Sequence, residues 1–170
     1  YSYEDFVQGW RPTESGGVTL RNGPFYEFCG RAAEEPNTPF VFIIDEINRG
    51  NLSRIFGELL MLIEGDKRGP DHAIPLTYSS DGERFSVPDN VHVLGLMNTA
   101  DRSLAMVDYA LRRRFAFVTL EPAFGTEAFQ DYLLAAEVED GVVRLIDERM
   151  QALNEKIESD KKNLGPGYVV

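Results

Sequence analysis

Two short stretches of the chain are apolar almost without interruption. The first, Phe40–Ile44, ends in the adjacent carboxylates Asp45 and Glu46, and the second, Val91–Met97, ends in Asn98. Such stretches predict strands buried on both faces, as in a parallel sheet covered by helices. Ligands of open α/β sheets bind at the carboxyl ends of strands. The polar residues that follow the two strands are therefore candidates for one common site.

Apolar residues at helical spacing predict helices around these strands. The expected helices cover residues 25–33, 52–64, 103–114, 126–136 and 142–159. Asn51 is suited to cap the second helix and Gly65 to end it. The last helix should bury one stripe, consisting of Val142, Leu145, Ile146, Met150 and Leu153.

The remaining segments predict smaller elements. Residues 1–24 should form a short helix around 3–8 and then an irregular loop, because proline and glycine interrupt it. Residues 73–87 predict an exposed β-hairpin around Asp81 and Gly82, and residues 115–120 a third strand. This order indicates an α/β core over residues 1–121 and a separate helical piece over residues 122–170.

Composition narrows the function classes. The chain has 170 residues, 43% of them hydrophobic, which suffices for one ordinary core. The formal net charge of −11 argues against non-specific binding of DNA or of an anionic membrane. The single cysteine, Cys29, excludes an internal disulfide, is expected to be buried and unreactive, and is typical of a reducing compartment such as the cytoplasm. No apolar stretch is long enough to span a membrane.

The acidic pair and Asn98 carry the chemistry that these strands suggest. In P-loop nucleotide hydrolases an aspartate at this place helps to hold Mg²⁺, and a second polar group orients the attacking water. Asp45 and Glu46 fit these roles, although two acids can also simply end a strand. The amide of Asn98 could hold a water or a phosphate oxygen, or could cap the next helix.

Three consecutive arginines, Arg112, Arg113 and Arg114, end the predicted helix over 103–114. Cations in a last helical turn are favoured by the helix dipole alone. One of them could instead reach a phosphate bound by a neighbouring subunit, as an arginine finger does. Successive helical residues point about 100° apart, so the three arginines cannot share one target. His72 and His92 lack partners at zinc-ligand spacing, and no phosphate-binding P-loop motif occurs in the chain.

Three segments resemble the McrB family, the AAA+ GTPase subunits of modification-dependent restriction systems. They are VFIIDEINRGN at 41–51, GLMNTADRS at 95–103 and DYALRRRF at 108–115. The segments YSYEDF at 1–6, KRG at 67–69 and PLTY at 75–78 are also similar to that family. The resemblance implies an AAA+ core with a hairpin inserted before the second strand, followed by the start of a helical lid. The phosphate-binding loop would precede Tyr1, so the chain is expected to be a fragment without hydrolytic activity of its own.

The resemblance also implies roles for the candidate residues. Asp45 would coordinate Mg²⁺, Glu46 would activate water, and Asn98 would contact that water or the γ-phosphate of GTP. Arg113 and Arg114 match the finger that acts on a neighbour, with Arg112 as a further candidate. Asn48 and Arg49 would face a neighbouring subunit or a partner protein.

The intact protein would then be a ring, expected to be a hexamer. It would hydrolyse GTP and work with an McrC-like endonuclease to translocate and cleave modified DNA, which other domains recognise. Two alternatives stay open: a MoxR-like ATPase that remodels a protein client, and a non-catalytic AAA+-like scaffold. The residues that would distinguish GTP from ATP are not present in this chain.

Overall fold

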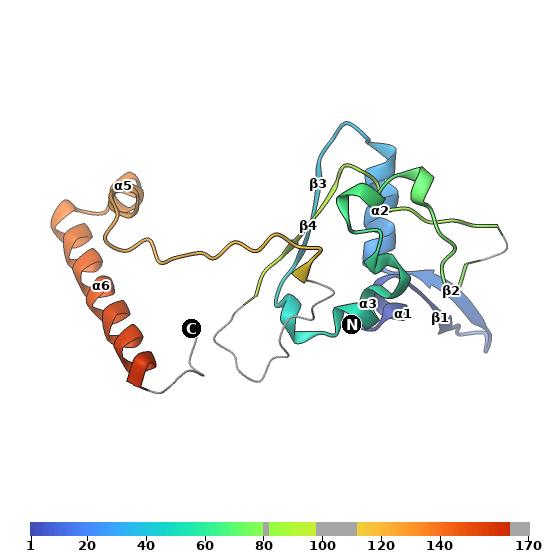
Figure 1. Ribbon diagram of the computed structural model, residues 1–170, viewed down its shortest axis with the longest axis horizontal. Coiled ribbons are helices and arrows are strands. Elements are labelled where there is room, and N and C mark those ends of the chain that lie inside the picture. The colour runs from blue at the N-terminus through green and yellow to red at the C-terminus, as the bar shows by residue number, and fades with distance from the viewer. Residues whose placement is uncertain (80–81, 98–111, 164–170) are drawn as a thin grey trace. The chain divides into compact units, whose positions relative to one another are not determined.

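The computed structural model describes residues 1–79, 82–97 and 112–163 (Figure 1). The contacts within the chain divide it into two compact units, and the division falls after Ala116. Among the described residues, the first unit contains strands β1 to β4 and the second contains helices α5 and α6.

A pair of parallel strands lies beside α2 (Pro24–Glu34) in the first unit (Figure 1). β3 (Phe40–Ile44) pairs with β4 (Val91–Gly95), with Phe40 opposite Val91 and Ile44 opposite Gly95. Both strands fall where the apolar stretches predict them. The pairing brings their carboxyl ends to the same edge, as the proposed common site requires.

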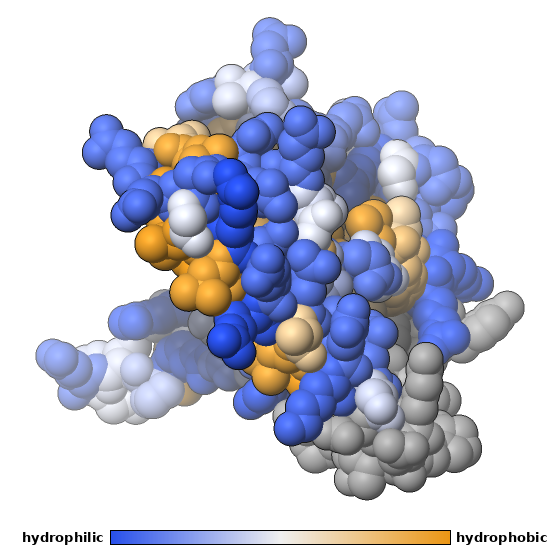
Figure 2. All heavy atoms as spheres, turned by 90° about the vertical axis from the view of Figure 1, so that its left-hand side faces the viewer, coloured by the Kyte–Doolittle hydropathy of each residue, from blue (hydrophilic) through white to orange (hydrophobic). Residues whose placement is uncertain are grey.

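The two strands are buried on one face only. Phe40, Phe42 and Ile44 pack against the core, whereas Val41 and Ile43 on the other face are 52% and 58% exposed. Leu94 of β4 is also exposed. The prediction of burial on both faces is therefore wrong, because among the described residues the core packs against one face of the pair. Figure 2 shows apolar side chains at the surface among polar ones.

The buried face of the sheet packs on aromatic rings. α2 (Pro24–Glu34) places Phe25 against Phe42, with ring centroids 5.2 Å apart. Phe6 of α1 (Tyr3–Phe6) stacks on Phe25 at 5.3 Å and meets Phe56 edge-on at 5.0 Å. Four rings in contact make this cluster a strong contribution to stability. The helices predicted over 25–33 and near residue 3 are confirmed.

The irregular loop expected before α2 is instead an antiparallel hairpin. β1 (Gln8–Pro12) pairs with β2 (Val18–Asn22), with Trp10 opposite Leu20. Pro12 sits at the strand end, and Gly16 provides the positive φ of 84° that the turn needs. Proline and glycine thus mark the ends of the two strands and do not prevent the strands from forming.

The helix predicted over 52–64 is interrupted. Asn51 caps α3 (Leu52–Phe56) as expected, but Gly57 adopts φ 54° and ends the α-helix. A Cβ at this position would lie 2.9 Å from the Tyr3 ring, so the close approach requires glycine. Short 3-10 helices continue the chain as η2 (Gly57–Leu60), η3 (Gly65–Lys67) and η4 (Pro70–His72).

Two further strand predictions differ from the structure. Within the described residues of the segment 73–87, an antiparallel bridge joins Ile74 and Phe85. Phe85 and Val87 are buried in the core, so this segment is not the exposed hairpin that was expected. Residues 115–120 run without strand pairing, and Val118 and Leu120 are more than 80% exposed.

The second unit is a pair of helices, α5 (Glu127–Ala135) and α6 (Asp140–Asn163). Both were predicted. The buried positions of α6 are Val143 and Asp147, whereas Val142, Leu145 and Leu153 are exposed, so the predicted buried stripe is wrong. Asp147 accepts hydrogen bonds from the Gly125 amide and from Gln130, which fix the turn before α5. In the described part of the chain no helix is long and apolar enough to cross a membrane.

Candidate functional site

Asp45 and Glu46 form a tight turn directly after β3. Glu46 has left-handed backbone angles, φ 52° and ψ 46°, which are uncommon for a residue with a side chain. The Asp45 Oδ1 accepts a hydrogen bond from the Glu46 amide at 2.9 Å. Strained residues of this kind are held by their surroundings and cluster at functional sites. The turn thus fixes both carboxylates at the carboxyl edge of the sheet.

Contacts between the two strand ends hold this turn. Ile47 begins the 3-10 helix η1 (Ile47–Arg49) and is 9% exposed. Its amide donates to the carbonyl of Leu96 at 2.9 Å, and the Leu96 amide donates to Ile44 at the same distance. Gly95 leaves the room that the Ile47 side chain fills, since a Cβ there would lie 2.6 Å from Ile47 Cδ1. The acidic turn therefore depends on the end of β4.

The two carboxylates differ in their charged neighbours. Glu46 forms an ion pair with Arg49 in the same turn, with 41% of the Glu46 side chain exposed. Asp45 is exposed, and no ion pair to it is formed within the described residues. Arg49, expected at an interface, is thus engaged by Glu46 within its own chain. Asn48 lies partly buried between them.

The donor set suits Mg²⁺ bound together with a nucleotide. Mg²⁺ is usually held by one or two carboxylates, with water and substrate phosphates completing the shell. Asp45 offers an exposed carboxylate with one oxygen already oriented by the Glu46 amide. Within the described residues no group of three or more histidine, cysteine, aspartate or glutamate side chains could bind a metal alone. Asp45 can supply one carboxylate to a Mg²⁺ ion that is bound in this way.

Asn98, the third predicted member of the site, lies outside the described residues. The backbone leading to it is described. Leu96 sits beside Ile44 and Ile47, and Met97 is 37% exposed. The chain thus leaves β4 next to the acidic turn, while the proximity of the Asn98 amide stays a prediction.

The structure separates the three arginines. Arg114 pairs with Glu64, with 2.7 Å between Arg114 Nε and Glu64 Oε1, and only 8% of its side chain is exposed. Arg112 and Arg113 are exposed. Glu64 has no role in the sequence argument beyond marking the end of a helix. A single glutamate before a glycine does not indicate in the sequence that it will form an ion pair with Arg114.

Gly95 was likewise missed as a contributor to the site. A glycine inside a strand pattern often marks a close approach of another group. Here that group is Ile47, which follows the acidic pair. The glycine inside the strand pattern could therefore have been recognised from the sequence, but its contact with Ile47 could not.

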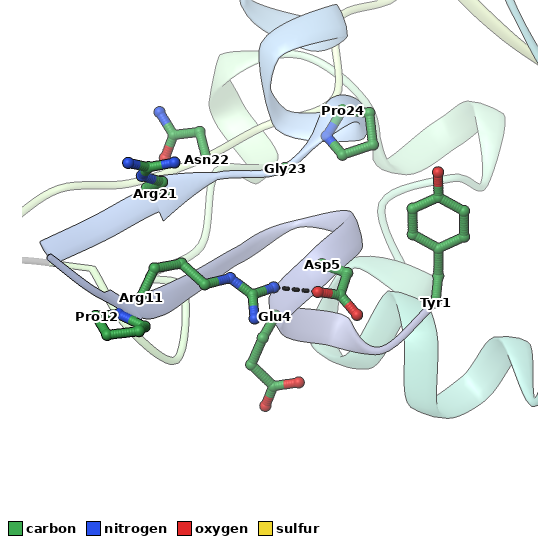
Figure 3. A pocket seen from close by; sticks show the side chains of 9 residues that line it. All are labelled: Tyr1, Glu4, Asp5, Arg11, Pro12, Arg21, Asn22, Gly23 and Pro24. Carbon is green, nitrogen blue, oxygen red and sulfur yellow. Dashed lines mark hydrogen bonds and ion pairs between the residues drawn. The ribbon is translucent and has the colours of Figure 1, made fainter. Parts of the chain in front are cut away.

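An open pocket of about 580 Å³ lies elsewhere in the first unit (Figure 3). Residues of α1, β1, β2 and the start of α2 line it, and Arg11 faces Asp5 across it in an ion pair. None of the predicted site residues lines this pocket. Two of its four charged residues, Arg11 and Asp5, are already paired with each other.

Known proteins resemble this chain over most of its length. A family model described as "AAA domain (dynein-related subfamily)" matches residues 1–115. The type IV methyl-directed restriction enzyme EcoKMcrB subunit of Escherichia coli (strain K12) is 53% identical over 169 residues, which cover 99% of this chain and 37% of that protein. The type II restriction enzyme BsuMI component YdiS of Bacillus subtilis (strain 168) is 32% identical over 110 residues, 58% of this chain and 32% of that protein.

The chain spans about a third of the length of these two relatives. The resemblance to McrB noted from three short segments extends over essentially all 170 residues. The parallel strand pair with helices on its buried face agrees with an α/β nucleotide-hydrolase core. The chain therefore belongs to the dynein-related subfamily of AAA domains.

Proposed function

We propose that the intact protein is a GTP-hydrolysing AAA+ motor of a modification-dependent restriction system. The observation that carries this proposal is the fixed acidic turn at the end of β3, in a chain 53% identical to a methyl-directed restriction subunit. The second relative is also named as a restriction component. Both names favour restriction over the MoxR-like alternative. The exposed, ordered carboxylates favour catalysis over a scaffold.

Asp45 and Glu46 have distinct roles in this proposal. Asp45, together with the nucleotide phosphates, would hold Mg²⁺, and the bound ion would neutralise charge on those phosphates. Glu46 accepts a hydrogen bond from the attacking water and orients it, and Arg49 forms an ion pair with Glu46 in the same turn. Asn98 contacts the same water or the γ-phosphate.

Assembly supplies the remaining groups. A neighbouring subunit of the ring, expected to be a hexamer, contributes an arginine from the segment 112–114. Asn48 and Arg49 lie beside Glu46, where a neighbouring subunit or an McrC-like endonuclease could act on the water-orienting residue. Hydrolysis would drive translocation on modified DNA, which other parts of the protein recognise. The net charge of −11 suits a motor core that leaves DNA recognition to other domains.

Hydrolysis of GTP and of ATP by the intact protein tests the proposal. Glu46→Gln should lower kcat for GTP by about 10²–10⁴-fold, the usual contribution of a general base. Glu34→Gln, which removes an exposed carboxylate at the end of α2, is the matched control and should leave kcat unchanged. A preference for ATP would replace this proposal with the remodelling ATPase. If neither nucleotide is hydrolysed, even with an McrC-like partner present, the non-catalytic scaffold becomes the remaining interpretation.

A further inference from the structure

We propose that Glu64 is a positioning residue for the arginine finger, and that Arg114 is its anchor rather than the finger itself. The exposed Arg112 or Arg113 would then be the residue that reaches the neighbouring nucleotide. This inference rests on the proposed function, since it assumes hydrolysis between subunits.

The burial of Arg114 argues for an anchor. Its side chain is 8% exposed and its Nε lies 2.7 Å from a carboxylate oxygen of Glu64. Separating the pair would take the Glu64 carboxylate away from a guanidinium that is little exposed to water, which is unfavourable, although the Glu64 side chain itself is 28% exposed. A finger must instead extend from the surface into another subunit. Arg114 is therefore poorly placed to act as the finger, whereas Arg112 and Arg113 are exposed.

The residue after Arg114 strengthens the anchor. Phe115 is partly buried and packs against the core cluster. Two consecutive side chains, one ionic and one aromatic, thus fix the end of the arginine segment to the first unit. The preceding two arginines have no such burial. Their direction is set by the anchored residues behind them.

Glu64 itself directly follows buried residues of the first unit. It follows Leu62 and Ile63, which are 0% and 5% exposed. Arg68 donates hydrogen bonds to the carbonyl of Ile63 and to that of Val91 at the start of β4. Glu64 is therefore tied to the same strand pair that carries the acidic turn. A finger anchored on Glu64 keeps a fixed place relative to the sheet of its own subunit.

The first test is kinetic and uses the intact protein. Glu64→Gln should lower kcat for GTP by about 10²-fold, the effect of misplacing a catalytic group by about 1 Å, with KM little changed. Asp66→Asn is the matched control. It removes a negative charge from the next turn, where Asp66 pairs only with its neighbour Lys67 among the described residues.

The charge-swapped variant, Glu64→Arg with Arg114→Glu, separates anchor from finger. It restores the ion pair but places a carboxylate at position 114. Recovery of kcat toward wild type supports Arg114 as an anchor. If the swapped protein folds and forms rings yet stays as inactive as Arg114→Ala, Arg114 is itself the finger and the inference is wrong.

Mixed rings distinguish a lost finger from a damaged fold. Subunits carrying Glu46→Gln keep their finger but lack their own water-orienting residue. Mixing them with Glu64→Gln subunits places intact sites beside intact fingers at some interfaces, so turnover should exceed that of either variant alone. The same recovery is expected with whichever of Arg112→Ala and Arg113→Ala removes the finger. Lack of recovery in rings that assemble normally would overturn the inference. If wild type itself does not hydrolyse GTP, the proposed function fails first.

Discussion

Gly95→Ala tests the contact that holds the acidic turn. The added Cβ would lie 2.6 Å from Ile47 Cδ1, 3.1 Å from its Cγ2 and 3.4 Å from its Cβ. Carbon atoms pack best at about 3.5–4.0 Å, so Ile47 must withdraw by about 1 Å at its tip. Overpacking of this kind costs about 1–3 kcal/mol. We expect about 1–2 kcal/mol, because rotation of the Ile47 side chain relieves part of the clash.

Ile47→Val provides the compensating change, since it deletes the Cδ1 atom in closest contact. Alone it should cost about 0.5–1.5 kcal/mol. In the Gly95→Ala background it should cost less, which gives a favourable coupling energy of about 1 kcal/mol in a double-mutant cycle. Chemical unfolding of the intact protein measures the stabilities. GTP hydrolysis should follow the same order, because Ile47 directly follows Glu46.

Gly30→Ala is the control for the effect of replacing a glycine by alanine where the added Cβ causes no clash. Gly30 lies within α2, and a Cβ there meets no atom within 4 Å. Alanine in place of a helical glycine should be neutral or stabilise by about 0.5–1 kcal/mol. Strictly additive effects of Gly95→Ala and Ile47→Val, or an unchanged stability for Gly95→Ala, would refute the packing argument.

Two further predictions concern the pKa values of buried or hydrogen-bonded groups. Burial raises the pKa of the Cys29 thiol to about 12 despite the nearby Arg68. Thiol reagents at pH 8 should therefore label Cys29 only after the protein unfolds. Rapid labelling of the native protein, measured by mass spectrometry, would contradict this. Burial tends to raise the pKa of Glu58, but hydrogen bonds from Tyr3 and Thr77 outweigh it and lower the pKa. Glu58→Gln should therefore cost about 1 kcal/mol at pH 7, and this difference should shrink as pH falls below about 4; a pH-independent difference in thermal unfolding would exclude the mechanism.

Local sequence signals determined several elements. Stretches that are apolar almost throughout defined β3 and β4, because a strand needs only a few residues of one character. Thr126 caps α5 by accepting a hydrogen bond from the Phe129 amide, and this signal also lies within one turn of chain. Cys29 was expected to be buried because its neighbours, Phe28 and Gly30, offer no base or metal partner, and it is 2% exposed.

Other elements depended on partners far along the chain. The hairpin of β1 and β2 arises from pairing between segments that look irregular when taken singly. α3 ends at Gly57 because the ring of Tyr3 occupies the space beside it. The buried stripe of α6 was misassigned because Asp147 is buried by bonds to the turn at Gly125, which helical periodicity does not register.

The candidate site shows the same division. The sequence alone placed Asp45 and Glu46 at the end of a strand, since apolar stretch and acidic pair are contiguous. It could not rank the three arginines, which are identical in type and adjacent in position. Only the tertiary structure separates them, because Glu64, from a different part of the chain, pairs with Arg114 and removes it from solvent. Burial and ion pairing depend on which surfaces meet, and a linear pattern does not specify that.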